Sequence, residues 1–345
     1  MSEIYDVTIV GGGPAGLYSA FYSGLRAMKT KVIESQAQLG GKVRIYPEKV
    51  IWDVGGMPPL RGEKFVENLI TQGLTFEPTL CLNTKVEYIT KEGGLFTLIT
   101  NDGEKHKSKA IIMANGGGII SPQKLDVEGA KKYELTNLHY TVQRIERFKD
   151  KHVLISGGGN AAIDWAAELF NIAASVTVIY RKDELTAHEA QIQKLRENNV
   201  EIILNATITS LLANQDSHNI SQVVLNINGD IRHVAVDEVL INHGYNREAS
   251  LEFEECIKPK MKDGYYYIGT PKCLLSTDGI FAAGDIITYE GKVNLLVGAF
   301  QDAINAVNSA KVYIEPSAYD TAMVSSHNEV FTERNEILLK EELGI

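Results

Sequence analysis

The sequence has few cysteines, and this scarcity narrows the kind of protein it can encode. Its three cysteines, Cys81, Cys256 and Cys273, are odd in number and lie far apart along the chain. Such spacing predicts neither a disulfide framework nor a zinc site, so we expect no bound metal. A chain without paired cysteines is typical of the reducing cytoplasm, which is the location we predict.

Long apolar stretches and an excess of positive charge are also lacking. No apolar stretch reaches the roughly 20 residues that a membrane helix needs, and residues 1–5 lack the pattern of a signal peptide. Lys and Arg number 34 against 44 Asp and Glu, a formal net charge of −10. This balance disfavours binding to nucleic acids or to anionic membranes. The length of 345 residues and the 44% hydrophobic content indicate about two globular domains.

A unit of strand, glycine-rich turn, helix and strand occurs twice. In the first copy an apolar strand at 7–10 leads into the turn GGGPAG at 11–16, a helix pattern and a strand at 31–34. The same order recurs within residues 153–180, around the turn GGGNAA at 157–162. The strand before and the helix after each turn make these glycine patterns specific rather than accidental.

The glycines of such a turn have separate physical tasks. The first permits a tight turn, the second lets the backbone approach a pyrophosphate, and the third lets the helix pack closely on the sheet. The helix N-terminus then offers free N–H groups to the phosphates. Two turns therefore predict two bound dinucleotides. The predicted contacts are Gly11, Gly13, Ala15 and Gly16 in the first unit, and Gly157, Gly159, Asn160 and Ala161 in the second.

The residue that ends the second strand distinguishes the two units. Glu34 ends the strand of the first unit, where a carboxylate can accept hydrogen bonds from ribose hydroxyls and would repel a 2′-phosphate. This favours the adenosine of FAD. The second unit has Tyr180 at that position, followed by Arg181 and Lys182. Two cations favour a 2′-phosphate, so we expect NADPH there.

A third pattern completes the predicted fold. The apolar stretch TDGIFAAGD at 277–285 delivers Asp285, whose carboxylate can hold the ribityl hydroxyls of a flavin. Because strand and helix patterns resume after residue 279, the first domain is expected to be discontinuous. We predict an α/β fold with two Rossmann-like domains of the three-layer ββα type. The FAD-binding domain would comprise residues 1–116 and 246–345, with the NADPH-binding domain, residues 117–245, inserted into it.

Several short segments carry a resemblance to a known family. They are QLGG at 38–41, YPEK at 46–49, LHY at 138–140, YEGKVNL at 289–295 and AVN at 306–308. With the glycine turns, they make nearly the whole chain similar to thioredoxin-reductase-like flavoproteins, and most of all to the bacterial ferredoxin (flavodoxin)–NADP reductases. The resemblance implies a homodimer and FAD contacts at Glu34, Gln38, Gly41, Lys42, Tyr46, Val86, Ile120, Asp285 and Ser326.

The resemblance also implies how the flavin ring is held. Tyr46 would stack on one face, and His327 is the candidate for the other, although the family's C-terminal histidine would align without gaps with Val324. Neither residue acts as an acid or base. Position 42 is usually Gln in the family, and here it is Lys. The nicotinamide would give a hydride to the flavin, which would pass single electrons to a ferredoxin or a flavodoxin.

The cysteine positions argue against a dithiol relay. Thioredoxin reductases of this shape carry Cys-x-x-Cys before the second glycine turn, yet residues 140–151 contain no cysteine, and neither do residues 35–54. A relay needs two thiols within reach of each other and of the flavin.

Two alternative functions stay open. One is an NAD(P)H oxidase or a small-molecule or disulfide reductase, and the other is a flavin redox sensor that turns over slowly. An acidic carrier would need a basic patch, for which Lys42, Arg44, Lys49 and Arg61 are candidates.

Overall fold

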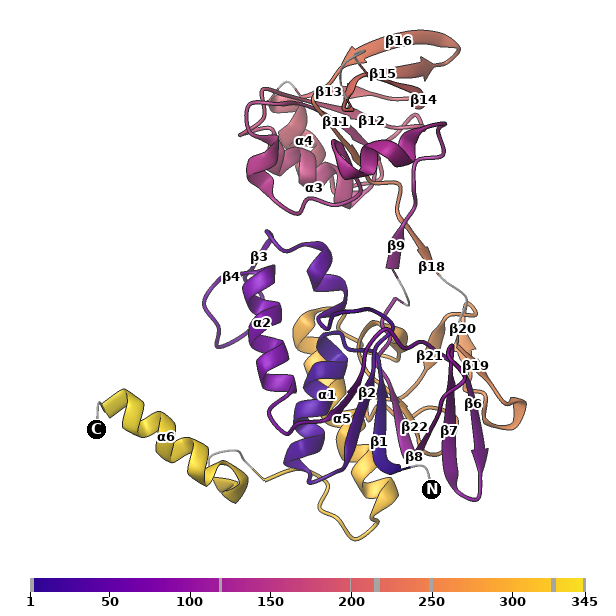
Figure 1. The fold of residues 1–345 in the computed structure, drawn as a ribbon, viewed down its shortest axis with the longest axis vertical. Helices are drawn as coiled ribbons and strands as arrows, with labels where there is room; N and C mark the ends of the chain where they lie inside the picture. Colours follow the sequence, from indigo (N-terminus) through magenta and orange to yellow (C-terminus); the bar gives the residue numbers. More distant parts are fainter. Residues whose placement is uncertain are drawn as a thin grey trace. The chain divides into compact units, whose positions relative to one another are not determined.

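The chain folds into two compact units, one of which is inserted into the other. Unit 1 comprises residues 1–119 and 248–345, and unit 2 comprises residues 120–247. Both are mixed α/β structures (Figure 1). The computed structural model describes residues 3–117, 120–198, 200–213, 218–247, 251–323 and 327–343.

Unit 1 is built on a mixed β-sheet. Its strands are β1 (Ile4–Val10), β2 (Thr30–Ile33), β5 (Thr79–Cys81), β6 (Val86–Glu92), β7 (Leu95–Thr100), β8 (Lys105–Met113), β19 (Glu252–Phe253) and β22 (Ile280–Ala282). They lie in the order β19-β6-β7-β8-β1-β2-β5, and β22 pairs with β8. β1 runs parallel to both β2 and β8, whereas β7 is antiparallel to β6 and β8. Val7 and Ile9 of β1 are fully buried, as expected for a central strand.

Three helices lie together along unit 1: α1 (Pro14–Leu25), α2 (Gly62–Gly73) and α5 (Leu296–Ile314). Figure 1 shows α1 beside both α2 and α5. Pro14 opens α1, where a missing N–H costs no hydrogen bond. α5 buries small side chains, Ala303, Ala306 and Ala310, all without exposed surface. Small residues allow α5 to approach α1 and the sheet closely.

Short elements complete unit 1. They are the 3₁₀ helices η1 (Gly41–Ile45), η4 (Glu255–Ile257) and η5 (Gly284–Ile286), and the strands β3 (Val50–Ile51), β4 (Leu60–Arg61), β20 (Met261–Lys262), β21 (Tyr266–Ile268) and β23 (Ile287–Thr288). β3 and β4 form an antiparallel hairpin. β21 lies between β20 and β23 in a separate small sheet.

Unit 2 contains a parallel sheet with the order β10-β17-β11-β12-β13 and a three-stranded antiparallel sheet, β14-β15-β16. The parallel strands are β10 (Leu138–His139), β11 (His152–Ser156), β12 (Ser175–Ile179), β13 (Glu201–Ile203) and β17 (Glu238–Ile241). The antiparallel strands are β14 (Ala206–Ala213), β15 (Ile220–Ile227) and β16 (Asp230–Ala235). The remaining elements are α3 (Asn160–Leu169), α4 (Glu189–Glu197), η2 (Ala130–Leu135), η3 (Ile145–Phe148) and the paired strands β9 (Ile120–Pro122) and β18 (Tyr245–Arg247).

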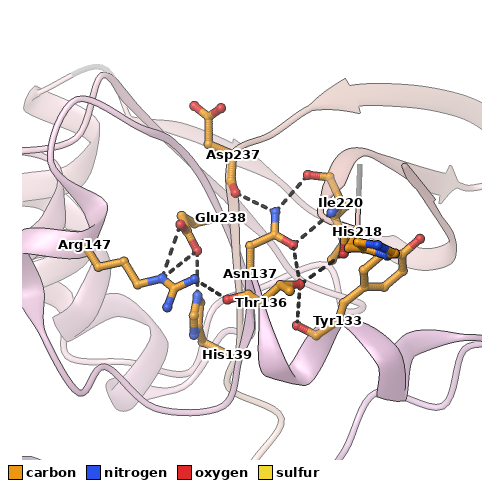
Figure 2. A network of polar contacts seen from close by, with 9 residues as sticks. All are labelled: Tyr133, Thr136, Asn137, His139, Arg147, His218, Ile220, Asp237 and Glu238. Atoms are coloured by element: carbon orange, nitrogen blue, oxygen red, sulfur yellow. Dashed lines mark hydrogen bonds and ion pairs between the residues drawn. The ribbon is translucent and has the colours of Figure 1, made fainter. Parts of the chain in front are cut away.

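A polar network ties the segment before β11 to the rest of unit 2 (Figure 2). The Asn137 side chain donates to the carbonyl of Ile220 at 2.8 Å and accepts from its N–H at 2.9 Å. Glu238, which is 7% exposed, lies 2.6 Å from Nε2 of His139 and 3.3 Å from Nε of Arg147. Each buried polar group shown here therefore has partners, which is the condition for a polar network to stabilise a fold.

The C-terminal part of unit 1 contacts the segment that follows α2. It contains η7 (Glu329–Phe331) and α6 (Thr332–Leu343). The ring centroids of Phe331 and Phe76 are 5.6 Å apart, and Arg334 donates to the carbonyl of Thr75 at 2.8 Å. None of the described helices combines the length and the apolar character needed to cross a membrane.

Candidate functional site

The first glycine turn, between β1 and α1, is too crowded for side chains at most of its positions. Gly11 has φ +110°, and a Cβ there would lie 2.5 Å from the carbonyl oxygen of Ala114. A Cβ at Gly16 would lie 1.9 Å from the carbonyl oxygen of Gly11. At Gly13, by contrast, the nearest atom to a Cβ is the Cα of Gly41 at 3.6 Å. The turn thus has room for a Cβ at Gly13 in ordinary van der Waals contact, at the position where the glycine fingerprint places the pyrophosphate.

Glu34 follows β2 directly and is fixed beside this turn. Its Oε2 accepts from the backbone N–H of Gly12 at 2.6 Å, and its Oε1 accepts from the N–H of Gln36 at 2.8 Å and from the hydroxyl of Ser35 at 3.1 Å. A carboxylate has about four acceptor positions. Glu34 therefore holds the turn and keeps acceptor capacity for a ribose hydroxyl.

The turn after β22 brings Asp285 to the same place. Gly284 has φ +81°, and a Cβ there would lie 2.9 Å from the Cβ of Ala15 in the first turn of α1. Gly284 thus packs against the start of α1, and the exposed Asp285 follows it. Ala15 and Asp285 are 270 positions apart in the sequence. The segments that contain them meet at the N-terminus of α1.

The segment from Gln38 to Tyr46 borders the same turn. The N–H of Gly40 donates to the carbonyl of Gly12 at 2.8 Å, and a Cβ at Gly41 would lie 2.7 Å from the Cα of Gly13. Gln38 accepts a hydrogen bond from Arg44.

The side chains later in this segment differ in exposure. Lys42 is exposed, Tyr46 is half-buried, and the Lys49 Nζ lies 5.8 Å from the centre of the Tyr46 ring. A Cβ at Gly62, the first residue of α2, would lie 2.5 Å from the carbonyl oxygen of Tyr46, so α2 begins directly against this residue.

The other residues expected to contact FAD fall in different places. Val86, the first residue of β6, is buried, and the N–H of Thr84 just before it donates to the carbonyl of Glu34 at 3.0 Å. Ile120 is the first residue of β9. Ser326 lies outside the described residues. His327 is exposed and lies four positions before Phe331, whose ring packs near the end of α1 opposite the glycine turn.

The second glycine turn, between β11 and α3, repeats the geometry of the first. A Cβ at Gly157 would lie 2.5 Å from the carbonyl oxygen of Asn242, and a Cβ at Gly158 would lie 2.3 Å from the Tyr180 ring. At Gly159 the nearest atom to a Cβ is the Thr186 hydroxyl oxygen at 4.0 Å. A Cβ at Gly159 would therefore fit without a clash, as it would at Gly13. Ala161 lies in the first turn of α3.

The loop after β12 folds back onto this second turn. Arg181 and Lys182 are exposed at its start. The N–H of Thr186 donates to the carbonyl of Gly158 at 2.7 Å, and the N–H of His188 donates to Oδ1 of Asn160 at 3.0 Å. Asn160 thus positions the loop that carries the two cations. This role was not expected from the sequence, nor was that of Thr186.

His243 lies at the end of β17, beside the second turn. Its Nε2 is 2.8 Å from the Ser156 hydroxyl oxygen. Burial, followed by the positive charge of Arg181, lowers the pKa of His243 below its usual value. The positive charge of Arg181, in the loop after β12, therefore acts on His243, which follows β17.

Two asparagines that the sequence did not single out lie beside the turns. Asn115 follows β8 next to the first turn, and Asn242 follows β17 next to the second. Within the described part of the chain, the Oδ1 atom of each is buried without a hydrogen-bond partner. Unpaired buried polar atoms beside both turns fit the binding of a polar ligand at each, because such atoms are costly when left unsatisfied.

The three cysteines are all in unit 1 and none forms a disulfide. Cys81 is half-buried in β5, Cys256 is exposed in η4, and Cys273 is buried. Burial raises the pKa values of the Cys81 and Cys273 thiols. Protonated thiols are poor nucleophiles, so neither of these two is prepared for disulfide exchange.

Two glycine turns of matched geometry, in a sheet domain and in a second domain inserted into it, define a protein with two dinucleotide-binding domains. Residues 5–310 match the family described as pyridine nucleotide-disulphide oxidoreductase. The chain belongs to this family.

Similar proteins share nearly the whole chain. A protein of Lysinibacillus sphaericus named ferredoxin–NADP reductase 3 is 58% identical over 99% of both chains. One of Oceanobacillus iheyensis named ferredoxin–NADP reductase 1 is 56% identical over 97% of both. Among solved structures, thioredoxin reductase of Lactococcus lactis has a TM-score of 0.71 at 24% identity, covering 90% of this chain and 99% of that one. The structural likeness confirms the predicted fold class of two Rossmann-like domains.

Proposed function

We propose that this chain is an FAD-dependent ferredoxin–NADP⁺ or flavodoxin–NADP⁺ oxidoreductase. The observation that carries the proposal is the difference between the two turns: a buried carboxylate, Glu34, is fixed beside the first, and two exposed cations, Arg181 and Lys182, follow the second. The names of the 54–58% identical relatives support the same activity. When bound, the flavin supplies the chemistry, because it takes a hydride from the nicotinamide and releases electrons singly.

We assign FAD to unit 1. The N-terminus of α1 offers its free N–H groups and dipole to the pyrophosphate, and Glu34 and Asp285 offer acceptors for ribose and ribityl hydroxyls. Tyr46 supplies an aromatic face for the flavin ring, with His327 as the candidate for the opposite face. The proposed contacts in unit 1 are Gly11, Gly13, Ala15, Gly16, Glu34, Gln38, Gly41, Lys42, Tyr46, Val86, Asp285 and Ser326. Ile120, the first residue of unit 2, is a further proposed contact.

We assign NADPH to unit 2. The N-terminus of α3 would receive its pyrophosphate, and the exposed Arg181 and Lys182 would bind the 2′-phosphate through charge-assisted hydrogen bonds. Thr186 and Asn160 hold the loop that presents these cations. The proposed contacts are Gly157, Gly159, Asn160, Ala161, Arg181 and Lys182.

Electrons would leave the flavin directly for a carrier protein. A dithiol relay lacks its paired thiols, since Cys81 and Cys273 are shielded and Cys256 stands alone on the surface. The carrier would dock on the exposed hairpin β3–β4, where Trp52 is 75% exposed. Lys42 and Arg44, both exposed in the neighbouring η1 helix, would attract an acidic partner.

The oligomeric state and the location complete the proposal. Ile337, Leu338 and Leu339 of α6 are each more than half exposed, which supports burial of this helix in a homodimer. Three unpaired cysteines support a reducing, cytoplasmic location.

A steady-state assay with purified ferredoxin and flavodoxin tests the activity. We expect NADPH-dependent reduction of one of these carriers to be faster than reduction of oxygen, quinone or a disulfide. Rising salt should slow the carrier reaction, because attraction between exposed charges is screened within about 10 Å at 0.1 M salt. Equal rates with carrier, oxygen and dye would contradict the assignment. A flavin that NADPH does not reduce would favour a redox sensor instead.

A further inference from the structure

A buried carboxylate lies directly behind the turn that carries Asp285. Asp302, on α5, has no exposed surface, and its partner Lys292 is only 5% exposed, with Nζ and Oδ2 2.5 Å apart. The same Oδ2 accepts from the backbone N–H of Gly284 at 3.0 Å. The other oxygen, Oδ1, accepts from the Tyr289 hydroxyl at 2.5 Å. Both oxygens are thus engaged by groups from the segment that follows β22.

The neighbours of Asp302 remain hydrogen-bond donors at neutral pH. Burial, followed by the hydrogen bond to Asp302, raises the pKa of Tyr289. Burial, followed by the Asp302 charge, raises the pKa of the Cys273 thiol. Neither Tyr289 nor Cys273 adds a second negative charge to the cluster. The ammonium of Lys292 pairs with the Asp302 carboxylate.

Packing alone does not explain this cluster. A buried ion pair contributes little net stability, because removing two charges from water costs about as much as their attraction returns. Ala303 and Ala306 already pack the same helix without polar groups. The specific effect of Asp302 is a bond to the N–H of Gly284, a residue held at φ +81° against Ala15. Asp302 thereby joins α5, the Gly284 turn and the start of α1.

We propose that Asp302 and Lys292 are positioning residues of the flavin site. Asp302 fixes the Gly284 turn so that Asp285 is presented to the ribityl chain. The ammonium of Lys292 balances the buried negative charge of the Asp302 carboxylate. The inference rests on the proposed assignment of FAD to unit 1.

The test compares variants by their FAD dissociation constants, measured by adding flavin to apoprotein, and by the visible circular dichroism of the bound flavin. Asp302→Ala should weaken FAD roughly tenfold or more, the value of a hydrogen bond to a charged group, and should change the flavin spectrum. The double variant Asp302→Asn/Lys292→Met should recover most of the affinity. Its amide oxygen can still accept from Gly284, and it leaves no unpaired cation.

Two further variants separate positioning from folding. Asn137→Ala removes a side chain in unit 2 that is 3% exposed and makes four hydrogen bonds. It should lower the melting temperature and leave FAD affinity unchanged. Tyr289→Phe removes a single donor to Asp302 and should weaken FAD severalfold even if Asp302→Ala does not fold.

Unchanged FAD affinity in Tyr289→Phe or Asp302→Ala would overturn the inference, as would an equal loss in Asn137→Ala. Failure of the unmodified chain to bind FAD would be a different result. It would contradict the proposed function, and with it the premise of this inference.

Discussion

The two nucleotide sites differ most clearly in single residues. Glu34 is buried, and its carboxylate accepts hydrogen bonds from the N–H groups of Gly12 and Gln36. These bonds hold the side chain in place before a ribose binds. Arg181 and Lys182 are exposed, so a ligand can reach both side chains from solvent. Rigid acceptors suit a cofactor that stays bound, and exposed cations suit a substrate that binds and leaves.

The first prediction concerns Arg181 and Lys182. Replacing both with Gln should raise KM for NADPH by roughly 100-fold or more, because each of the two charge-assisted bonds to a phosphate contributes about 1.5–3 kcal/mol. KM for NADH should change little. Steady-state kinetics with both nicotinamides measures this.

The matched control is the exposed basic pair Lys131 and Lys132 in the same unit. Its double Gln variant removes the same charge and should leave both KM values unchanged. A similar loss with NADH and NADPH in Arg181→Gln/Lys182→Gln would refute the assignment of these residues to the 2′-phosphate.

The second prediction concerns His106 in β8. Its Nδ1 lies 3.0 Å from Nζ of Lys31, which is 7% exposed. Burial, followed by the Lys31 charge, lowers the pKa of His106. The unfolded chain, with a pKa near 6.5, therefore binds this proton more readily than the folded chain. Stability should be complete above about pH 6.5 and should fall as the pH drops below it.

Urea unfolding at about pH 7.5 and 5.5 measures this dependence. His106→Gln should reduce the loss of unfolding free energy on acidification, because Gln cannot take up a proton there. The same change at the exposed His233 is the control and should leave the pH dependence as it was. An identical pH dependence in His106→Gln and the unmodified chain would contradict the account.

At the scale of elements, both glycine turns were predictable because the task of each glycine is local. The strands end one residue earlier than the sequence predicted, at Ile33 and Ile179, so Glu34 and Tyr180 stand just beyond them. After Ile33 the Glu34 carboxylate accepts from the N–H groups of Gly12 and Gln36, and the sequence pattern alone does not show these contacts.

Other parts of the site could not be read from the sequence. Asn115 and Asn242 look like ordinary loop residues until strand pairing brings them beside the turns. Asp302 is one of several polar residues of α5, and only the fold shows that it is buried and meets the N–H of Gly284. These roles depend on contacts between distant segments, which no local spacing encodes.

The third prediction concerns helix α6. If its exposed apolar side chains are buried in a homodimer, Leu338→Asp should shift the protein from dimer to monomer in analytical ultracentrifugation. Burying an unpaired charge in an apolar interface is costly. Lys340→Asp on the same helix is the control for added negative charge and should remain dimeric. A monomeric unmodified chain, or a fully dimeric Leu338→Asp variant, would refute this role of α6.

At the scale of the whole molecule, two similar domains are proposed to hold different dinucleotides, so that electrons enter through unit 2 and leave through unit 1. Because a Cβ fits at Gly13 and at Gly159 without a clash, each proposed site can be altered separately. Both residues have extended backbones, with φ −78° and −92°, that Ala adopts without strain. A Cβ at either position meets no atom closer than 3.6 Å. Each variant should therefore fold and present one extra methyl to the pyrophosphate.

The most direct test is the flavin content and NADPH reduction of these two variants. Gly159→Ala should purify with one FAD per chain and should need roughly tenfold more NADPH for the same rate of flavin reduction, as overpacking by one methyl predicts. Gly13→Ala should bind FAD roughly tenfold more weakly, by the same reasoning, and should bind NADPH as the unmodified chain does. Loss of flavin from Gly159→Ala would contradict the assignment of FAD to unit 1 and NADPH to unit 2. An unmodified protein that is colourless and takes up no flavin would contradict it as well.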